Sequence, residues 1–157
     1  MTPRTMILIA AGGSLALLLG AWTFQALGYA PCKMCYWQRW PHMAAVVIGA
    51  AALLLPVAMR PLALLGAVAA ATTGVIGVYH TGVERGWWPG PTSCSGGADL
   101  GGISGSDLLS VDTVDKVIMC DEVSWSLFGL SMASWNAVAS FALALIWLRA
   151  WRLAAIR

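Results

Sequence analysis

The stretch MILIAAGGSLALLLGAWTFQAL, residues 6–27, decides the fold class because it contains no Asp, Glu, Lys or Arg. It lies inside a charge-free interval at residues 5–32, and three further intervals of this kind follow at residues 40–59, 61–83 and 123–148. A helix needs about 20 mainly apolar residues to cross the hydrocarbon core of a bilayer. Each interval reaches that length, so the sequence predicts four membrane-spanning helices.

The composition agrees with a lipid environment. Hydrophobic residues make up 59% of the 157 residues and charged residues 10%, against roughly 25% charged in a soluble domain. The intervals are continuously apolar, whereas barrel strands alternate over about 10 residues, and a helix satisfies its own backbone polar groups in lipid. A cleaved signal peptide is the alternative for the first interval, but residues 6–27 exceed the usual apolar core of 7 to 15 residues.

These observations predict an all-α integral membrane protein, a four-helix bundle with two extracytoplasmic loops. We expect a single domain, residues 1–157, with spans at about 6–27, 41–59, 61–80 and 124–148 and loops at 28–40 and 81–123. We expect contact with membrane lipid and no nucleic-acid partner.

The charges and the cysteines bear on orientation. Four crossings place both termini and Arg60 on one side, with five arginines and no acid, and place the two loops on the other, with two lysines, two arginines and all seven acids. Counting Lys and Arg alone gives a small excess on the termini side, which favours a cytoplasmic location for it. Stable disulfides belong to oxidising compartments, and all four cysteines fall on the loop side. We therefore predict periplasmic loops and cytoplasmic termini.

The cysteines form two unlike pairs. Cys32 and Cys35 make a Cys-x-x-Cys motif after Pro31, whereas Cys94 and Cys120 lie far apart in the second loop. A close pair can cycle between dithiol and disulfide with little backbone movement, and a distant pair on a long loop can reach another protein. Two alternatives stay open: two structural disulfides that staple a membrane scaffold, or a zinc site made of four thiolates.

Three polar side chains near the predicted membrane boundary add to this pattern. Arg39 follows Cys35 by four residues, which places both on one face if the chain is helical there, and a nearby cation lowers the pKa of a thiol. His80 ends the third predicted span, where it either takes part in the chemistry or is only interfacial. We expect His42 to be structural, and no metal is predicted.

The run PCKMCYWQR, residues 31–39, resembles the first periplasmic loop of the DsbB family, the bacterial disulfide bond formation proteins B. Nearly the whole chain shares the family pattern. It has four spans, an early Cys-x-x-Cys followed by Arg, a very short turn at Arg60, and a second loop with two separated cysteines.

The resemblance implies roles for the site residues. Cys94 is attacked by a DsbA-like thioredoxin-fold partner, Cys120 exchanges with Cys32, and Cys35 delivers electrons to a bound quinone, either ubiquinone or menaquinone. Arg39 matches the family arginine beside the quinone, and His80 matches a second quinone-binding position. The family gives no role to the position of Gln38.

The function implied is that of a multi-pass thiol:quinone oxidoreductase of the bacterial inner membrane. It would reoxidise the periplasmic partner, pass two electrons to the quinone and so support disulfide bond formation. A vitamin K epoxide reductase-like enzyme is one alternative, but there the quinone-proximal Cys-x-x-Cys comes late in the bundle. A non-enzymatic scaffold stapled by disulfides is the other.

Overall fold

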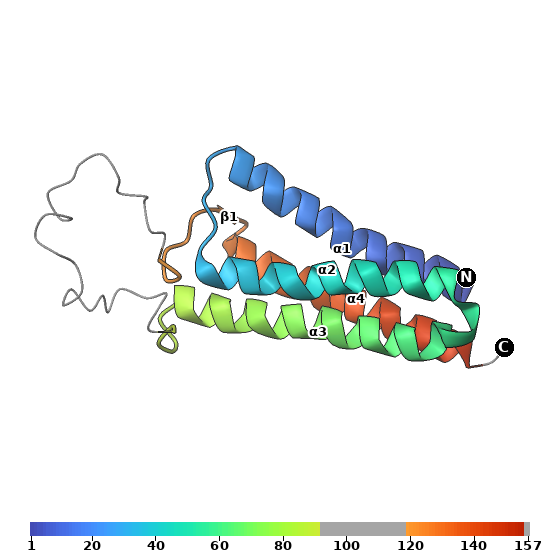
Figure 1. The fold of residues 1–157 in the computed structure, drawn as a ribbon. Coiled ribbons are helices and arrows are strands. Elements are labelled where there is room, and N and C mark those ends of the chain that lie inside the picture. Colours follow the sequence, from blue (N-terminus) through green and yellow to red (C-terminus); the bar gives the residue numbers. More distant parts are fainter. Residues whose placement is uncertain (92–118, 156–157) are drawn as a thin grey trace, which may run out of the picture.

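Four long helices form an elongated bundle (Figure 1). The computed structural model describes residues 1–91 and 119–155. The elements are α1 (Pro3–Ala26), α2 (Lys33–Leu54), a 3-10 turn η1 (Pro56–Ala58), α3 (Met59–Glu84), a hairpin of β1 (Ser126–Leu127) and β2 (Leu130–Ser131), and α4 (Met132–Ala154). Both termini lie at the end of the bundle where η1 joins α2 to α3 (Figure 1). The all-α bundle predicted from the sequence is confirmed.

Side-chain caps fix where three of the helices begin. Thr2 Oγ1 accepts a hydrogen bond from the backbone N–H of Thr5 at the start of α1. Ser131 Oγ does the same for Ser134 at the start of α4. At the start of α2 the capping atom is the sulfur of Cys32, which accepts from the N–H of Cys35. Such caps satisfy backbone donors that have no partner within the helix.

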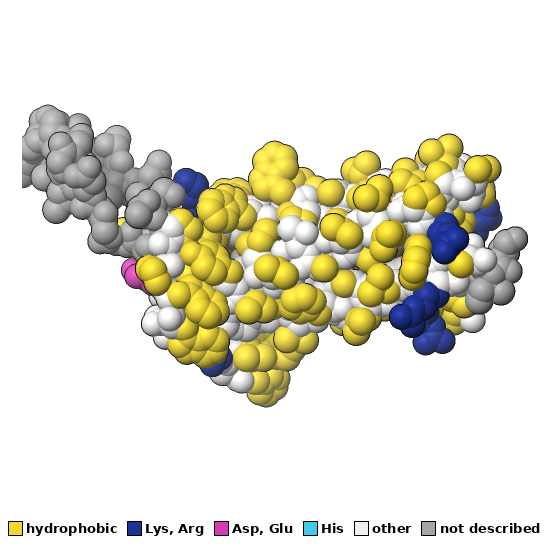
Figure 2. All heavy atoms as spheres, turned by 90° about the horizontal axis from the view of Figure 1, so that it is seen from below, with side chains coloured by type: hydrophobic (Ala, Val, Ile, Leu, Met, Phe, Trp, Pro, Cys, Tyr) yellow, Lys and Arg dark blue, Asp and Glu magenta, His cyan; other side chains and the backbone are white. Residues whose placement is uncertain are grey.

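Three segments of the described chain are long and apolar enough to cross a membrane: Pro3–Ala26, Pro56–Glu84 and Met132–Ala154. Large apolar side chains on their outer faces are exposed, among them Leu8, Leu19, Val68 and Leu145. Hydrophobic side chains also cover the middle of the face shown in Figure 2, and Lys and Arg side chains gather at the end that carries the termini. An apolar surface of this extent fits lipid rather than water.

The core is built from small residues packed around one large side chain. Trp147 of α4 is fully buried, and a Cβ placed on Gly66 of α3 would come within 2.6 Å of its ring. A Cβ on Gly77 would meet the backbone of α4 at Ala133 O, 3.0 Å away. Small residues at such positions let helix backbones approach closely, as is typical of membrane helices.

Two helix starts differ from the spans expected from the sequence. α2 begins at Lys33 rather than near Pro41, because the Cys32 cap starts the helix early and Pro41 is accommodated inside it. α4 begins at Met132 rather than near residue 124. Phe128 and Gly129 have positive φ angles of 52° and 76°, which form the tight turn of the hairpin and are incompatible with a right-handed helix.

Candidate active site

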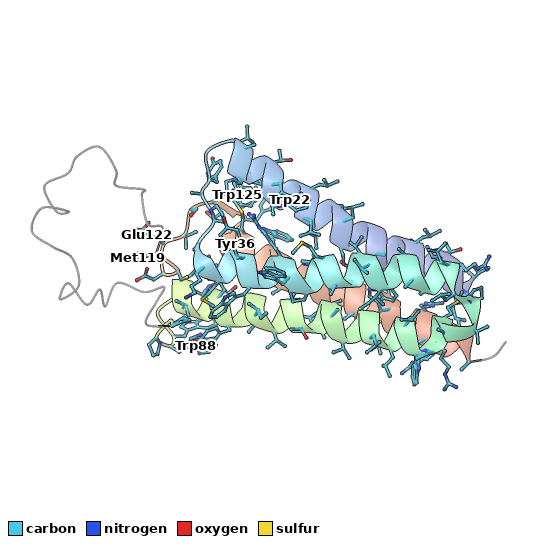
Figure 3. The ribbon with its side chains drawn as sticks, viewed as in Figure 1. Trp22, Tyr36, Trp88, Met119, Glu122 and Trp125 are labelled. Atoms are coloured by element: carbon cyan, nitrogen blue, oxygen red, sulfur yellow. The ribbon has the colours of Figure 1, made fainter. Side chains whose placement is uncertain are left out.

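A cavity of about 430 Å³ opens at the end of the bundle opposite the termini, between α1, α2, α4 and the hairpin segment. Figure 3 shows Trp22, Tyr36 and Trp125 around this end of α1 and α2. Its size is within the usual range for small-molecule sites, which are mostly apolar with a few polar groups. The polar and thiol residues of the lining are Cys32, Cys35, Gln38, Arg39, His42, His80, Glu84, Glu122, Ser124 and Asn136. The apolar side includes Leu17, Leu18, Phe24, Tyr29, Trp125, Leu127, Met132 and Trp135.

Cys32 and Cys35 are free thiols with their sulfur atoms 3.0 Å apart. Their position follows from the local fold, because Cys32 caps α2 and Cys35 lies in the first turn of the same helix. Cys32 is also at the positive end of the α2 dipole, which favours a negative charge. The pair can therefore share one proton and close a disulfide with a small change of side-chain rotamer.

The two thiols differ in acidity. The hydrogen bond from the Cys35 side chain, aided by His80 and opposed by burial, lowers the pKa of Cys32 from 9.0 to about 4. The pKa of Cys35 is raised, first by its hydrogen bond to Cys32 and then by burial, whereas the charge of Arg39 lowers it. The reduced pair therefore holds its negative charge on Cys32 and its proton on Cys35.

Two buried residues from distant parts of the chain meet Cys32. His80 of α3 places Nε2 3.5 Å from Cys32 Sγ. The ligand atoms of Cys32, His80 and Cys120 all lie within 4.8 Å of one another. Cys120 is fully buried and disulfide-bonded. Cys94, the remaining predicted site cysteine, lies outside the described residues.

Arg39 connects the thiol end of α2 to α1. Its guanidinium donates to Gln25 Oε1 at 2.8 Å and to the carbonyl of Ala21 at 3.5 Å. It also lies over the ring of Tyr36, 5.1 Å from the centroid. Arg39 and Cys35 line the same cavity, so a planar cation and a thiol are presented to whatever occupies it.

A chain of buried and part-buried hydrogen bonds continues from His80 into the bundle. Gln38 Nε2 lies 2.8 Å from His80 Nδ1, and Asn136 Nδ2 donates to Gln38 Oε1 at 2.8 Å. Asn136 Oδ1 in turn accepts from His42 Nε2 at 3.0 Å. The Thr73 hydroxyl donates to the carbonyl of Gln38. Gln38 and Asn136 were not expected at the site, and His42 was expected to be only structural. The spacing of residues 35, 38, 39 and 42 along one helical face could have indicated two of them.

The structure thus brings Cys32, Cys35, Arg39 and His80 around one cavity and places Cys120 beside Cys32. The sequence offered no histidine close to a cysteine, so the approach of His80 to Cys32 and Cys120 is a product of the tertiary fold. The roles expected for these residues stay predictions.

Comparison with known proteins adds one finding. The family model described as "Disulfide bond formation protein DsbB" matches residues 3–150. No curated protein and no solved structure matches the chain.

Proposed function

Because the chain belongs to the DsbB family of membrane disulfide bond formation proteins, we propose that it is a thiol oxidase that links a periplasmic dithiol to a membrane quinone. The partner is a DsbA-like thioredoxin-fold protein, and the electron acceptor is ubiquinone or menaquinone. The observation that carries the proposal is the position of the Cys32–Cys35 pair, between the buried Cys120 and the cavity that Arg39 lines.

The proposed relay consists of thiol–disulfide exchanges and a final oxidation. A thiolate of the reduced partner attacks Cys94 in a disulfide with Cys120, and the second thiol of the partner resolves the mixed disulfide. The partner leaves oxidised, and Cys94 and Cys120 become a dithiol. Attack of Cys120 on the Cys32–Cys35 disulfide at Cys32, resolved by Cys94, then reduces the close pair. Each exchange breaks one S–S bond and forms one, so electrons balance until the close pair is oxidised.

Side chains of this protein support the exchange at Cys32. The Cys35 N–H donates to Cys32 Sγ at 3.3 Å, and His80 Nε2 lies 3.5 Å away. Both contacts stabilise a thiolate at Cys32, which is the leaving group when Cys94 resolves the Cys120–Cys32 mixed disulfide. Arg39 places a positive charge near Cys35 and lowers the cost of ionising that thiol.

The cavity fits a quinone head group. It is bordered by aromatic rings, and Arg39 supplies a planar donor suited to a carbonyl oxygen. A bound quinone supplies a two-electron acceptor that takes two protons on becoming quinol. The residues that would hold it are Arg39 and the aromatic side chains of the cavity, beside Cys35. Its open side would let a lipid-soluble molecule enter from the bilayer.

The test is to supply the purified protein with a reduced thioredoxin-fold partner and quinone and to follow quinol formation. Quinol should form in proportion to partner disulfide, and Cys35→Ser should abolish both. Partner oxidation that proceeds equally well without quinone would contradict the proposal.

The order of the relay has its own test. Cys94→Ser and Cys120→Ser should each block oxidation of the protein partner while Cys32 and Cys35 still form their disulfide when quinone is added. A small dithiol that reaches the close pair directly should still be oxidised slowly. Either variant oxidising the partner at the parent rate would refute this order.

A further inference from the structure

Gln38 holds the imidazole of His80 from one side. Its amide nitrogen lies 2.8 Å from His80 Nδ1 and donates to the carbonyl of Met34 at 3.3 Å. The carbonyl of Met34 can only accept, so it fixes which end of the amide faces this way. Asn136 agrees, because its amide nitrogen donates to Gln38 Oε1. Gln38 and His80 are both buried, and an unmatched polar atom is costly in such a place.

This arrangement determines the tautomer of His80. An amide nitrogen only donates, so Nδ1 must accept, and the proton of the neutral ring is on Nε2. Nε2 then faces two acceptors, Cys32 Sγ at 3.5 Å and Glu84 Oε1 at 3.9 Å. The Gln38 contact sets this tautomer, and the N–H on Nε2 can then donate to either acceptor.

Cys32 and His80, together with Cys120, resemble part of a zinc site. Thiolates and imidazole nitrogen are preferred zinc ligands, and the ligand atoms of Cys32, His80 and Cys120 lie within 4.8 Å of one another. Cys35 adds another sulfur 3.0 Å from Cys32. If the reduced partner delivers a second pair of electrons before the close pair is reoxidised, all these sulfurs are free. A thiophilic metal would then compete with the thiol chemistry.

A histidine that binds a metal needs a lone pair on the ligating nitrogen, and its other nitrogen usually donates to a carboxylate or carbonyl. Gln38 does the reverse, since it donates to Nδ1. We propose that Gln38 is a positioning residue that keeps His80 as a hydrogen-bond donor to Cys32 and withholds it as a metal ligand. The proposal rests on the proposed function only because it takes Cys32 as a thiol that takes part in disulfide exchange.

The test exchanges the donor for an acceptor. Gln38→Glu places a carboxylate beside Nδ1, which should favour Nδ1–H and free Nε2 for a metal. Zn²⁺ affinity of the fully reduced protein should rise about ten-fold or more, the usual size of such an effect on a ligating histidine. Co²⁺ as a spectroscopic probe should show stronger thiolate-to-metal absorption with a histidine ligand.

Two controls separate ligation from general loosening of the site. Adding His80→Gln to the Gln38→Glu variant should remove the gained affinity, and Gln38→Met, which offers neither donor nor carboxylate, should gain less than Gln38→Glu. Equal Zn²⁺ affinity in the parent and Gln38→Glu would overturn the proposal, as would a gain that persists without His80.

A second measurement requires no variant. Nitrogen chemical shifts of ¹⁵N-histidine-labelled parent protein should show His80 protonated on Nε2 and unprotonated on Nδ1. The opposite pattern would refute the assignment even if Gln38→Glu failed to fold. Neither measurement uses the partner or quinone, so a failed oxidase assay and a failed tautomer assignment are distinct results.

Discussion

At the scale of single residues, the reduced thiol pair has one acidic member, and this gives a pH prediction. The pKa of Cys32 is lowered from 9.0 to about 4, chiefly by its hydrogen bond with Cys35. The thiolate is therefore present at neutral pH and is lost as pH falls through about 4. The lowered pKa of Cys32 stabilises the folded, reduced protein. This stabilisation is complete above the unfolded-state pKa of 9.0 and is lost as pH falls from there to about 4.

The measurement uses the Cys94→Ser/Cys120→Ser double variant. Of the four cysteines of the chain, only Cys32 and Cys35 remain in it. Reaction of the reduced pair with a small alkylating reagent should keep a thiolate component down to about pH 4. Further replacement of Cys35 by Ala should move that inflection upward, since it removes the side-chain hydrogen bond that is the largest cause of the shift. An inflection near that of an ordinary thiol with Cys35 present would contradict the assigned acidity.

Arg39 gives a second prediction at this scale. Arg39→Leu should weaken quinone binding, measured through tryptophan fluorescence, because it removes the fork of donors at the cavity. The loss should be about ten-fold, the size expected for a charge-assisted hydrogen bond of roughly 1.5 kcal/mol. Arg39→Lys, which keeps the charge without the fork, should recover only part of it.

A matched control separates binding from support of the helix pair. Gln25→Ala removes the 2.8 Å hydrogen bond that ties Arg39 to α1 but leaves the guanidinium in place. Quinone affinity should change less in this variant than in Arg39→Leu. Equal losses in the two would mean that Arg39 acts by joining α1 to α2.

The residues also show what the sequence could and could not reveal. Cys32, Cys35 and Arg39 were predicted because reactive residue types occur there at the spacing of a known motif. All three line the same cavity. Gln38 and Asn136 were not predicted, because an amide has no distinctive chemistry until its partners are known, and those partners are 42 and 98 residues from Gln38. Cys94 lies outside the described residues.

At the scale of elements, local apolar composition predicted four helices but not all of their ends. The ends depend on caps and turns. The sulfur of Cys32 starts α2 earlier than expected, and the positive φ angles of Phe128 and Gly129 delay α4. The early start of α2 places residues 35, 38, 39 and 42 on one helical face at the cavity.

The close packing of α3 on α4 gives a prediction at this scale. Gly66→Ala should destabilise the bundle by about 1–3 kcal/mol, the usual cost of overpacking. The new Cβ would lie 2.6 Å from the ring of Trp147, which is fully buried. Thermal unfolding in detergent is the measurement.

Gly12→Ala is the matched control, because no atom lies within 4 Å of a Cβ at that position in α1. There the change should be neutral or stabilising by up to about 1 kcal/mol, from helix propensity alone. If both variants lost equal stability, contact with Trp147 would not be the cause of the loss.

At the scale of the whole molecule, the two ends of the bundle differ in chemistry. The termini and η1 lie at one end (Figure 1), with Arg4, Arg60, Arg149 and Arg152. Within residues 1–91 and 119–155 the acids are Glu84, Asp121 and Glu122, all in segments at the opposite end, as are Cys32, Cys35 and Cys120. The opposite end carries three basic residues, Lys33, Arg39 and Arg85. The small excess of Lys and Arg at the termini end favours that end as cytoplasmic.

This polarity predicts which side of the membrane each end faces. In a background without native cysteines, a cysteine at Val57 beside Arg60 should be protected in intact cells from a membrane-impermeant thiol reagent. A cysteine at Phe128 in the hairpin should be labelled. Both side chains are highly exposed, at 101% and 88%, so poor access within the protein does not explain a difference between them. After the cells are opened, Val57→Cys should also be labelled, which controls for expression. Labelling of Val57→Cys but not Phe128→Cys in intact cells would show that the protein has the opposite orientation in the membrane. The thiol pair would then face the reducing cytoplasm, where an oxidase that supplies disulfides to periplasmic proteins could not meet its partner.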